Sequence, residues 1–469
     1  MHPAPRQIAN RLGRFSCVFL ASLVTVAQLS RAQTFNTIYS FSGPNGRNPY
    51  AGLTIAPGGA LYGTTMLGGT GCAGNNGVGC GTAVYLTPPA QGGAWSETVL
   101  YSFGSRAGDT IEPDSTLALT PGGTLFGTSM TGGANGTGTV FELAAPGGVW
   151  TEHVIHSFAG YPGYAAGASP LGVVASPTGV LYGTAEVGGA NGAGLVFELA
   201  PPAAAGEAWT YTVLYNFTAQ SGDGYAPYGP PILSPNGTLF GTTIYGGTGP
   251  CALDPTVTGC GTVFELSPPA PPGAAWSETV LYSFTGQDGD GVNPVGSLVA
   301  DSSGAIYGAT QAGGASPNCP TSRSSLPGCG TVFQLAPPQA PGGDWSEAVL
   351  YNFTGAPNDG ASPWAGIGAI GANGAVYGTT LYGGNPCKNR FQGLPAGCGT
   401  VFEIAPPEIP GAPWTETILY AFSQVGRAFP SGANPWAPVV LGANGALYGV
   451  TAAGGPNGAN GTVFEITLP

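Results

Sequence analysis

Apolar and polar residues alternate along short segments of this chain. From Trp95 to Phe103 every second side chain belongs to one face, which carries Val99 and Tyr101, while serine and threonine occupy the other face. A period of two residues predicts a β-strand, because successive side chains of a strand point to opposite sides. Beyond residue 32, no window longer than a strand follows the 3.6-residue period of a helix. The pattern therefore predicts an all-β chain.

The strand-like segments come in groups of four, and the group recurs seven times. In the second copy the segments span residues 115–120, 124–129, 138–144 and 150–158. The first two segments of each copy are joined by a short turn that ends in glycine, which suits a hairpin with a positive φ. The aromatic residue of the second segment recurs as Tyr62, Phe126, Tyr182, Phe240, Tyr307, Tyr377 and Tyr448.

Four antiparallel strands repeated seven times indicate a seven-bladed β-propeller over residues 33–469. The two ends of that range complement each other. Residues 35–41 match the fourth strand of a copy, whereas residues 461–466 match a third strand that no fourth strand follows. If residues 35–41 pair beside residues 461–466, they complete the last blade, close the ring and remove two exposed strand edges.

Residues 1–32 have a different pattern, typical of a secretory signal peptide. Three arginines precede a mostly apolar run over residues 15–29, and Ser30-Arg31-Ala32 offers small residues for cleavage. No later segment has 18 consecutive apolar residues, so no membrane insertion is expected. The chain is therefore expected to be exported, to the periplasm or outside the cell, as a monomer.

Charge narrows the range of partners. Beyond residue 32 the chain has six basic and 23 acidic residues, a net charge of −17. Such an acidic surface argues against binding to nucleic acid or to an anionic membrane. Gly (83 residues) and Pro (45 residues) are frequent, but here they separate regular strand segments and do not indicate disorder.

The repeated motif Gly-x-Leu-Tyr-Gly-Thr-Thr, followed by Gly-Gly and then Gly-Thr-Val-Phe-Glu-Leu, resembles the GloVer tandem repeat of exported bacterial proteins. The resemblance covers nearly all of residues 35–469. It implies an exported repeat protein and brings no established activity with it. Many relatives carry a C-terminal anchoring segment; none is recognisable here, so anchoring at the cell surface is not expected.

Eight cysteines beyond Cys17 form four local pairs in the same loop of four copies, between the second and third strands. This loop is longer in the copies that contain cysteine. Local disulfides that staple a long loop explain this distribution. A metal–thiolate site does not fit, because the spacings are not Cys-x-x-Cys and no histidine accompanies them. The expected disulfides are Cys72–Cys80, Cys251–Cys260, Cys319–Cys329 and Cys387–Cys398.

The other polar residues suggest no catalytic, cofactor or metal site. Glutamates recur at two equivalent positions in nearly every copy, which indicates a repeated structural role. His153 and His156 are three residues apart on a strand and so lie on opposite faces. The aspartates that precede the first strands suit turns better than calcium binding. They are Asp109, Asp223, Asp288, Asp290 and Asp359.

The residue after the proline of each first strand varies between copies. It is aromatic in three copies that become neighbours when the ring closes, as Tyr50, Trp364 and Trp436. Because first strands line a propeller's centre, these rings would form an arc at the mouth of the channel. They would either stack on a sugar or an apolar anchor of a partner, or simply pack as core.

The long cysteine loops and the loops between blades are expected on one face, which suggests that this face meets a partner. The leading hypothesis is therefore a secreted binding module for a glycan or an extracellular protein. The alternatives are an extracellular polysaccharide hydrolase or lyase and a structural protein of the cell envelope. An enzyme should show clustered acids that break the repeat, and along the sequence the acids look dispersed.

Overall fold

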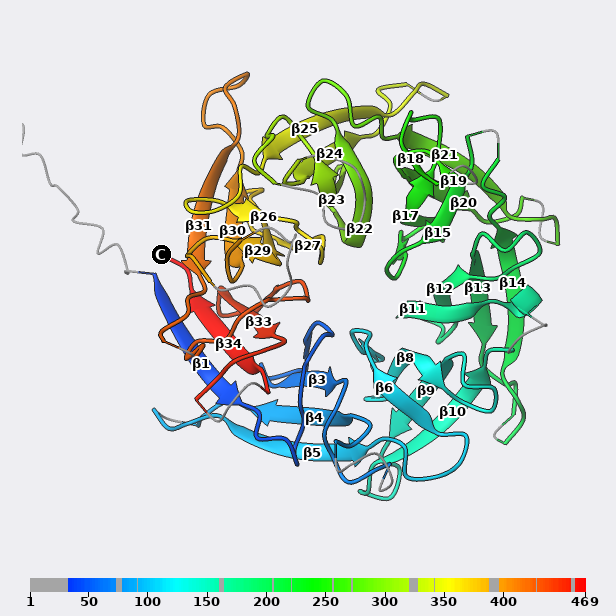
Figure 1. Cartoon of the computed structure of the whole chain (residues 1–469). Coiled ribbons are helices and arrows are strands. Elements are labelled where there is room, and N and C mark those ends of the chain that lie inside the picture. The colour runs from blue at the N-terminus through cyan, green and yellow to red at the C-terminus, as the bar shows by residue number, and fades with distance from the viewer. Residues whose placement is uncertain are drawn as a thin grey trace, which may run out of the picture.

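The computed structural model describes residues 33–469 except 73–77, 91, 160–163, 205, 221, 255–256, 271–272, 320–327, 341, 388–395, 427 and 457–459. The signal peptide expected over residues 1–32 lies outside the described residues. Seven antiparallel sheets surround a common centre (Figure 1). The predicted fold, a seven-bladed β-propeller, is confirmed.

Within each blade the strands run in order from the innermost to the outermost. Blade 1 contains β2 (Thr54–Ile55), β3 (Leu61–Thr65), β4 (Thr82–Thr87) and β5 (Ser96–Ser102). Blade 2 contains β6 (Thr110–Pro113), β7 (Ala118–Leu119), β8 (Leu125–Gly132), β9 (Thr139–Ala144) and β10 (Thr151–Ser157). Blade 3 contains β11 (Ala168–Ala175), β12 (Leu181–Val187), β13 (Leu195–Ala200) and β14 (Thr210–Asn216).

Blade 4 contains β15 (Gly224–Pro227), β16 (Ile232–Leu233), β17 (Leu239–Gly246), β20 (Thr262–Ser267) and β21 (Ser277–Ser283). Blade 5 contains β22 (Gly291–Ala300), β23 (Ile306–Gly313), β24 (Thr331–Ala336) and β25 (Ser346–Asn352). Blade 6 contains β27 (Ile367–Ile370), β28 (Val376–Thr380), β30 (Thr400–Ala405) and β31 (Thr415–Ala421). Blade 7 contains β32 (Val440–Leu441), β33 (Ala446–Thr451), β34 (Thr462–Thr467) and β1 (Thr34–Ser40).

A few short elements complete the described residues. β18 (Ala252–Asp254) pairs with β19 (Val257–Thr258), and β26 (Gly360–Ala361) pairs with β29 (Tyr382–Gly383). The one helical element in the described ranges is a 3₁₀ turn over Tyr164–Ala166. Across the part of the chain that the structure describes, no helix has the length and apolar character needed to cross a membrane.

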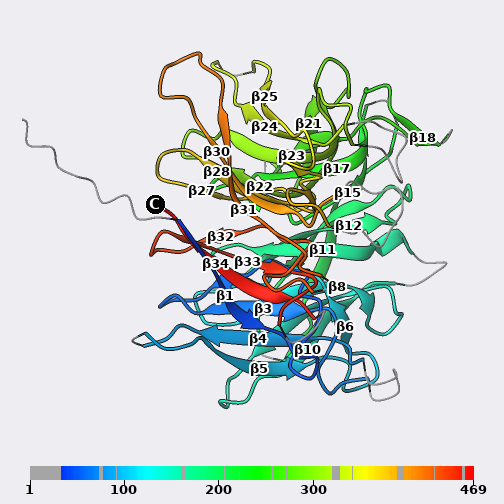
Figure 2. The same ribbon diagram turned by 60° about the vertical axis from the view of Figure 1, so that its left-hand side comes forward.

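The N-terminal strand closes the ring. β1 lies antiparallel to β34 and is the outermost strand of blade 7, as both ribbon views show (Figures 1 and 2). Phe35 of β1 pairs in register with Ile466, and its ring stacks on Tyr420 of blade 6 at a centroid distance of 3.7 Å. Closure therefore joins the two ends of the described chain and also adds packing against the neighbouring blade.

The core of the molecule lies between the blades. In six junctions the phenylalanine at the end of a fourth strand packs edge-on against the third-strand phenylalanine of the next blade, with ring centroids 5.1–5.6 Å apart. These twelve rings include eleven of the largest fully buried side chains, and Phe41 fills the same place where blade 7 meets blade 1. Because each blade buries its faces against its neighbours, stability depends on the complete ring.

Candidate functional site at the ring centre

A strained backbone position recurs at the inner edge of every blade. The residue before each inner-strand proline has a φ of 53–57°, a left-handed conformation that residues other than glycine seldom adopt. Its N–H donates to a backbone carbonyl of the preceding blade at 2.8–3.0 Å. These residues are Asn48, Glu112, Ser169, Ala226, Asn293, Ser362 and Asn434. We call this set of contacts the seam.

The seam explains the glycine of the Gly-Thr-Val-Phe motif. This glycine follows the carbonyl that accepts the seam hydrogen bond, and its φ lies between 88° and 110° in the seven blades. A Cβ added to Gly461 would lie 2.5 Å from Cδ of Pro49 in the next blade and 2.5 Å from the carbonyl oxygen of Thr451. The motif glycine therefore permits the proline ring of the next blade to pack against the backbone.

The inner strand is interrupted beside the seam in blade 2, whereas β11 of blade 3 and β22 of blade 5 continue through the seam. In blade 2, residues 115–120 were expected to form one strand, but the structure has β6 at 110–113 and β7 at 118–119. The physical reason is the left-handed residue Glu112 followed by Pro113, which breaks the regular pleat. The residue directly after the proline thus lies at the inner edge of the blade, next to the seam; in blade 5 this residue, Val295, also pairs with Ala309.

At this position the aromatic rings form a continuous row. Tyr50 contacts Trp436 with a centroid distance of 5.4 Å, and Trp436 contacts Trp364 at 5.6 Å. Tyr228 of blade 4 extends the row, because its ring is 5.8 Å from that of Trp364. Val295 of the intervening blade 5 is 1% exposed, whereas the four aromatic side chains are partly exposed. The row thus spans blades 1, 7, 6 and 4.

Acidic side chains stand beside this row. Asp114 occupies the same position in blade 2, and its Oδ1 is buried without a hydrogen-bond partner. The pKa of Asp114 is raised to about 8, mainly by burial and in part by the negative charges of Glu112 and Glu186, while backbone hydrogen bonds, one of them from Met130, act in the opposite direction. Glu186, at the end of β12, is partly buried, which also raises its pKa.

Tyr228 connects the acids to the aromatic row. Burial raises its pKa to about 12, with a further contribution from the negative charge of Glu186, while a hydrogen bond with the Trp364 side chain acts in the opposite direction. Asp114 lies close enough to add to the same shift. The ring centre therefore combines aromatic rings in edge-to-face contact with acidic side chains, an arrangement suited to recognising hydroxyl or ammonium groups.

The sequence reasoning missed the acids and Tyr228. Each of the three acids breaks the repeat: the residues equivalent to Glu112 and Asp114 are uncharged in the other six blades, and the residues equivalent to Glu186 are Met, Ile, Gln, Leu or Ala. That departure from the repeat was the available signal. Tyr228 stands at the variable position but belongs to blade 4, so ring order alone did not place it beside Trp364.

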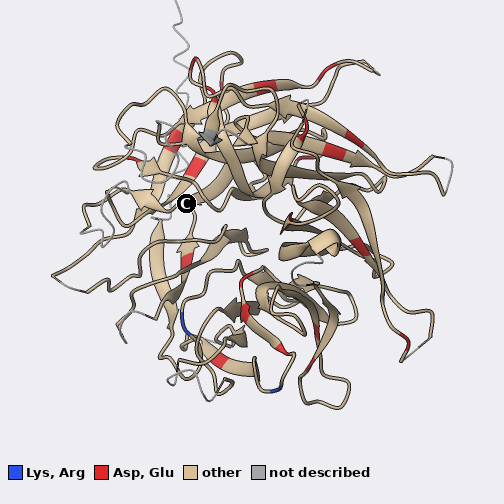
Figure 3. Cartoon of the chain, turned by 45° about the vertical axis from the view of Figure 1, so that its right-hand side comes forward, with Lys and Arg blue, Asp and Glu red and all other residues tan. Residues whose placement is uncertain are grey.

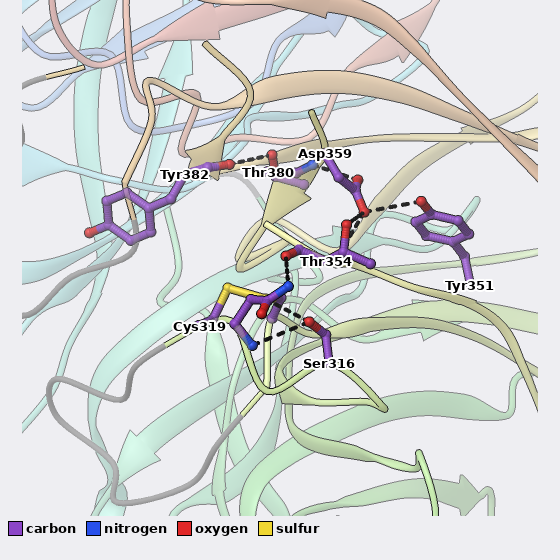
Figure 4. Close-up of a disulfide and its surroundings, with 10 residues drawn as sticks. Ser316, Cys319, Tyr351, Thr354, Asp359, Thr380 and Tyr382 are labelled. Carbon is purple, nitrogen blue, oxygen red and sulfur yellow. Dashed lines mark hydrogen bonds between the residues drawn. A yellow bond between two sulfur atoms is a disulfide. The ribbon is translucent and has the colours of Figure 1, made fainter. Parts of the chain in front are cut away.

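The loop aspartates form turns, as the sequence indicated. In blades 4, 5 and 6 the aspartate accepts hydrogen bonds from a threonine amide and hydroxyl and from a fourth-strand tyrosine. Asp359, for example, accepts from Tyr351 Oη at 3.0 Å and from the Thr354 amide at 2.6 Å (Figure 4). Within the described ranges, no three His, Cys, Asp or Glu side chains form a group suited to a metal ion.

The four expected disulfides are present: Cys72–Cys80, Cys251–Cys260, Cys319–Cys329 and Cys387–Cys398. Each lies against the loop that leads to the next blade. Around Cys319, the Nδ2 of Asn318 donates to the carbonyl of Thr354 at 3.4 Å (Figure 4). The carbonyl of the second cysteine in each pair accepts the seam hydrogen bond, so the disulfide loops support the ring centre.

The two histidines lie on opposite faces of β10, as the sequence suggested. His156 stacks on Tyr211 of blade 3 with a centroid distance of 4.1 Å, and burial lowers its pKa to about 4. His153 is exposed on the other face and lies 3.9 Å from Glu142. Neither histidine contributes to the ring centre.

The repeated fourth-strand glutamates lie between blades and face these turns. Burial raises the pKa of Glu278, Glu347 and Glu416 to about 7, and repulsion by Asp223, Asp290 and Asp359 respectively adds to the shift. Because these pKa values exceed the ordinary value of 4.5, the folded protein holds the protons more tightly than the unfolded chain. This stabilisation is complete below about pH 4.5 and is lost as the pH rises through about 7.

We therefore expect the melting temperature to rise by about 3–5 °C between pH 8 and pH 5, since each partly exposed glutamate contributes about 1 kcal/mol after solvent screening. His156 acts in the opposite direction below about pH 6.5, but it is one group against the three glutamates and the other acids with raised pKa values, Asp114 among them. Thermal melts of the unchanged protein and of the triple variant Glu278→Gln, Glu347→Gln, Glu416→Gln test this. The triple variant should lose the part of the pH dependence that these three glutamates contribute, and Glu142→Gln should keep all of it. A melting temperature that increases towards pH 8 would contradict the assignment.

By its fold the protein is a seven-bladed β-propeller. At its ring centre, variable side chains surround the repeated inner seam. Within that class, the chain belongs to the Gloeobacter/Verrucomicrobia repeat family, whose pattern matches residues 21–253 and 252–469. The resemblance read from the sequence is thus confirmed. No protein of curated function matches the chain.

Several solved structures are similar in fold. An ulvan lyase, a polysaccharide lyase, is 10% identical with a TM-score of 0.47, covering 91% of this chain and 94% of that chain. The PQQ-bound aldose sugar dehydrogenase from Streptomyces coelicolor is 17% identical with a TM-score of 0.41, covering 75% and 92%. The sialidase of Trypanosoma rangeli is 10% identical with a TM-score of 0.39, covering 94% and 59%. At these identities the likeness concerns the fold alone.

Proposed function

We propose that this chain is an exported binding propeller that holds a carbohydrate against the aromatic row Tyr50, Trp436, Trp364 and Tyr228. The observation that carries the proposal is the continuous contact of these four partly exposed rings. Aromatic faces stack on the apolar faces of sugar rings, and neighbouring carboxylates accept hydrogen bonds from sugar hydroxyls. Four disulfides fit the oxidising compartment in which an exported protein works.

The aromatic rings also contribute to packing, because Trp364 and Trp436 lie against a buried cluster that includes Ile367 and Phe402. Partial exposure leaves the four rings accessible to a ligand, whereas Val295 at the same position is buried. The alternative of a protein partner requires the same rings as anchors. The carbohydrate is preferred because the row is flanked by carboxylates, which an apolar anchor would leave without partners.

The test is the double variant Trp364→Ala, Trp436→Ala. We expect it to lose measurable binding to a panel of cello-, xylo- and chito-oligosaccharides, followed by calorimetry and tryptophan fluorescence, while stability falls by about 1 kcal/mol. If the two residues are core, stability should instead fall by about 3 kcal/mol or more per tryptophan. Trp345→Ala is the matched control, since Trp345 packs on Phe240 away from the ring centre. It should lose stability and keep binding.

A polysaccharide hydrolase or lyase is the second candidate. It is favoured by one observation, the grouping of Glu112, Asp114 and Glu186, which break the repeat and interact electrostatically. Acid–base cleavage of glycans uses a pair of carboxyl groups whose environments differ. The same panel distinguishes the candidates: new reducing ends that disappear in Asp114→Asn would establish an enzyme, whereas intact oligosaccharides would leave a binding module.

A further inference from the structure

The charges around the aromatic row indicate which class of carbohydrate the ring centre would bind. The three acids nearest the row, Glu112, Asp114 and Glu186, come from blades 2 and 3. In the part of the chain that the structure describes, the lysine and arginine side chains are Arg47 and Arg106 only, and acids are spread over all the blades (Figure 3). Neither arginine contributes to the electrostatic environment of Asp114, Glu186 or Tyr228.

The aromatic rings favour the same sign of ligand charge. The face of a tryptophan or tyrosine ring attracts a cation through its quadrupole. Trp364, Trp436, Tyr228 and Tyr50 form four such rings in succession, with angles of 70–90° between neighbouring ring planes. A site that combines such rings with carboxylates therefore repels a uronic acid and attracts an ammonium group.

An unsatisfied group independently marks the place of a ligand. Asp114 Oδ1 is buried and accepts no hydrogen bond, although it stands at the position that the seam holds toward the ring centre. A buried carboxyl oxygen without a partner costs free energy unless a donor reaches it. A ligand that carries N–H donors would supply that partner and also interact with Glu186.

We propose that the ring centre binds amino sugars, specifically chains of glucosamine, with the ammonium group between the acids Asp114 and Glu186 and the sugar rings on the aromatic row. This inference rests on the proposed carbohydrate-binding function and adds the class of sugar. The positive charge of the ammonium lowers the raised pKa of Asp114, so that the carboxyl group ionises and its free oxygen accepts a hydrogen bond from the ammonium. The aromatic rings stabilise the same charge through their faces. An N-acetylated sugar keeps the sugar ring but lacks the charge and carries an additional acetyl group.

The experiment compares four tetrameric probes on the full-length chain: glucosamine tetramer, its fully N-acetylated form, cellotetraose and tetralysine. Calorimetry is carried out at about 0.15 M salt, which screens attraction by the overall negative charge. We expect the glucosamine tetramer to bind about tenfold more tightly than the acetylated tetramer. Tetralysine should bind weakly, because it has the charge and lacks the sugar rings.

Two variants test whether the preference for a charged sugar depends on the acids at the ring centre. Glu186→Gln and Asp114→Asn should each reduce the preference for glucosamine over its acetylated form to less than about threefold. Glu142→Gln, on the outer part of blade 2, is the matched control and should keep the full preference. Thermal melts of each variant establish that the fold is retained.

The outcomes separate this inference from the proposal on which it rests. Equal binding of the glucosamine and acetylated tetramers overturns the amino-sugar inference and leaves carbohydrate binding standing. Binding of tetralysine as tight as that of the glucosamine tetramer, lost equally in Glu142→Gln, overturns it as well, since overall charge would then explain the attraction. If none of the three sugars binds to the unchanged protein, the carbohydrate-binding function itself is wrong.

Discussion

A chain that lacks residues 33–42 is expected to melt about 10 °C below the intact protein and to lose the cooperativity of its unfolding. The deletion removes β1 and the rings of Phe35 and Phe41, each of which contributes about 3–5 kcal/mol by burial. It also exposes the edge of β34 and opens blade 7, so that neither blade 7 nor blade 6 is fully covered. Differential scanning calorimetry measures the effect.

The matched control for this deletion is a chain that begins at residue 33. It keeps β1 and should melt as the intact protein does. Phe35→Ala is an intermediate case: the strand remains, and the contacts with Tyr420 and Phe464 are lost. We expect a loss of about 3–5 kcal/mol for this substitution. Unchanged stability of the chain that starts at residue 43 would show that the ring does not depend on β1.

The second large effect concerns the seam. Gly461→Ala should destabilise the protein by about 3–5 kcal/mol, because the new methyl group would overlap the backbone of Thr451 and the ring of Pro49, neither of which can move freely. Gly43→Ala is the matched control. Both glycines have a φ of 96°, and nothing lies within 4 Å of the Cβ position at Gly43.

The difference between the two variants measures the inter-blade contact alone. A left-handed conformation costs an alanine about 1 kcal/mol at either site, so Gly43→Ala should lower the free energy of unfolding by about that amount. Urea unfolding followed by tryptophan fluorescence gives both values under the same conditions. Equal losses in the two variants would mean that the proline contact is unimportant and that only the backbone conformation requires glycine.

Much of the architecture could be predicted because the same strand pattern occurs in seven copies. The alternation from Trp95 to Phe103 specifies a strand, and its recurrence specifies a blade, since a strand period depends on local sequence only. The local disulfides were predictable for the same reason: cysteines 8–11 residues apart in one loop have few other partners. Closure of the ring by residues 35–41 could be predicted because the last copy lacks a fourth strand and residues 35–41 match one.

The ring centre could be predicted only in part. Tyr50, Trp364 and Trp436 were found from the variability of one position, and the structure places Trp436 in contact with both of the others. Tyr228 was not chosen, because its contact with Trp364 passes over Val295 and depends on the sizes of three side chains. The order of the blades shows which blades are neighbours, but it does not show how far a side chain extends across the ring centre.

By itself, the sequence determined the strands, the seven blades, the closing strand and the local disulfides, because each depends on periodicity or on short-range spacing. Only the tertiary structure decided that Glu112, Asp114 and Glu186 interact, since they belong to two blades and to three different repeat positions. It also revealed the left-handed residue before each inner proline. In that conformation the residue donates its N–H to a carbonyl of the preceding blade, and no local pattern in the chain encodes such a contact.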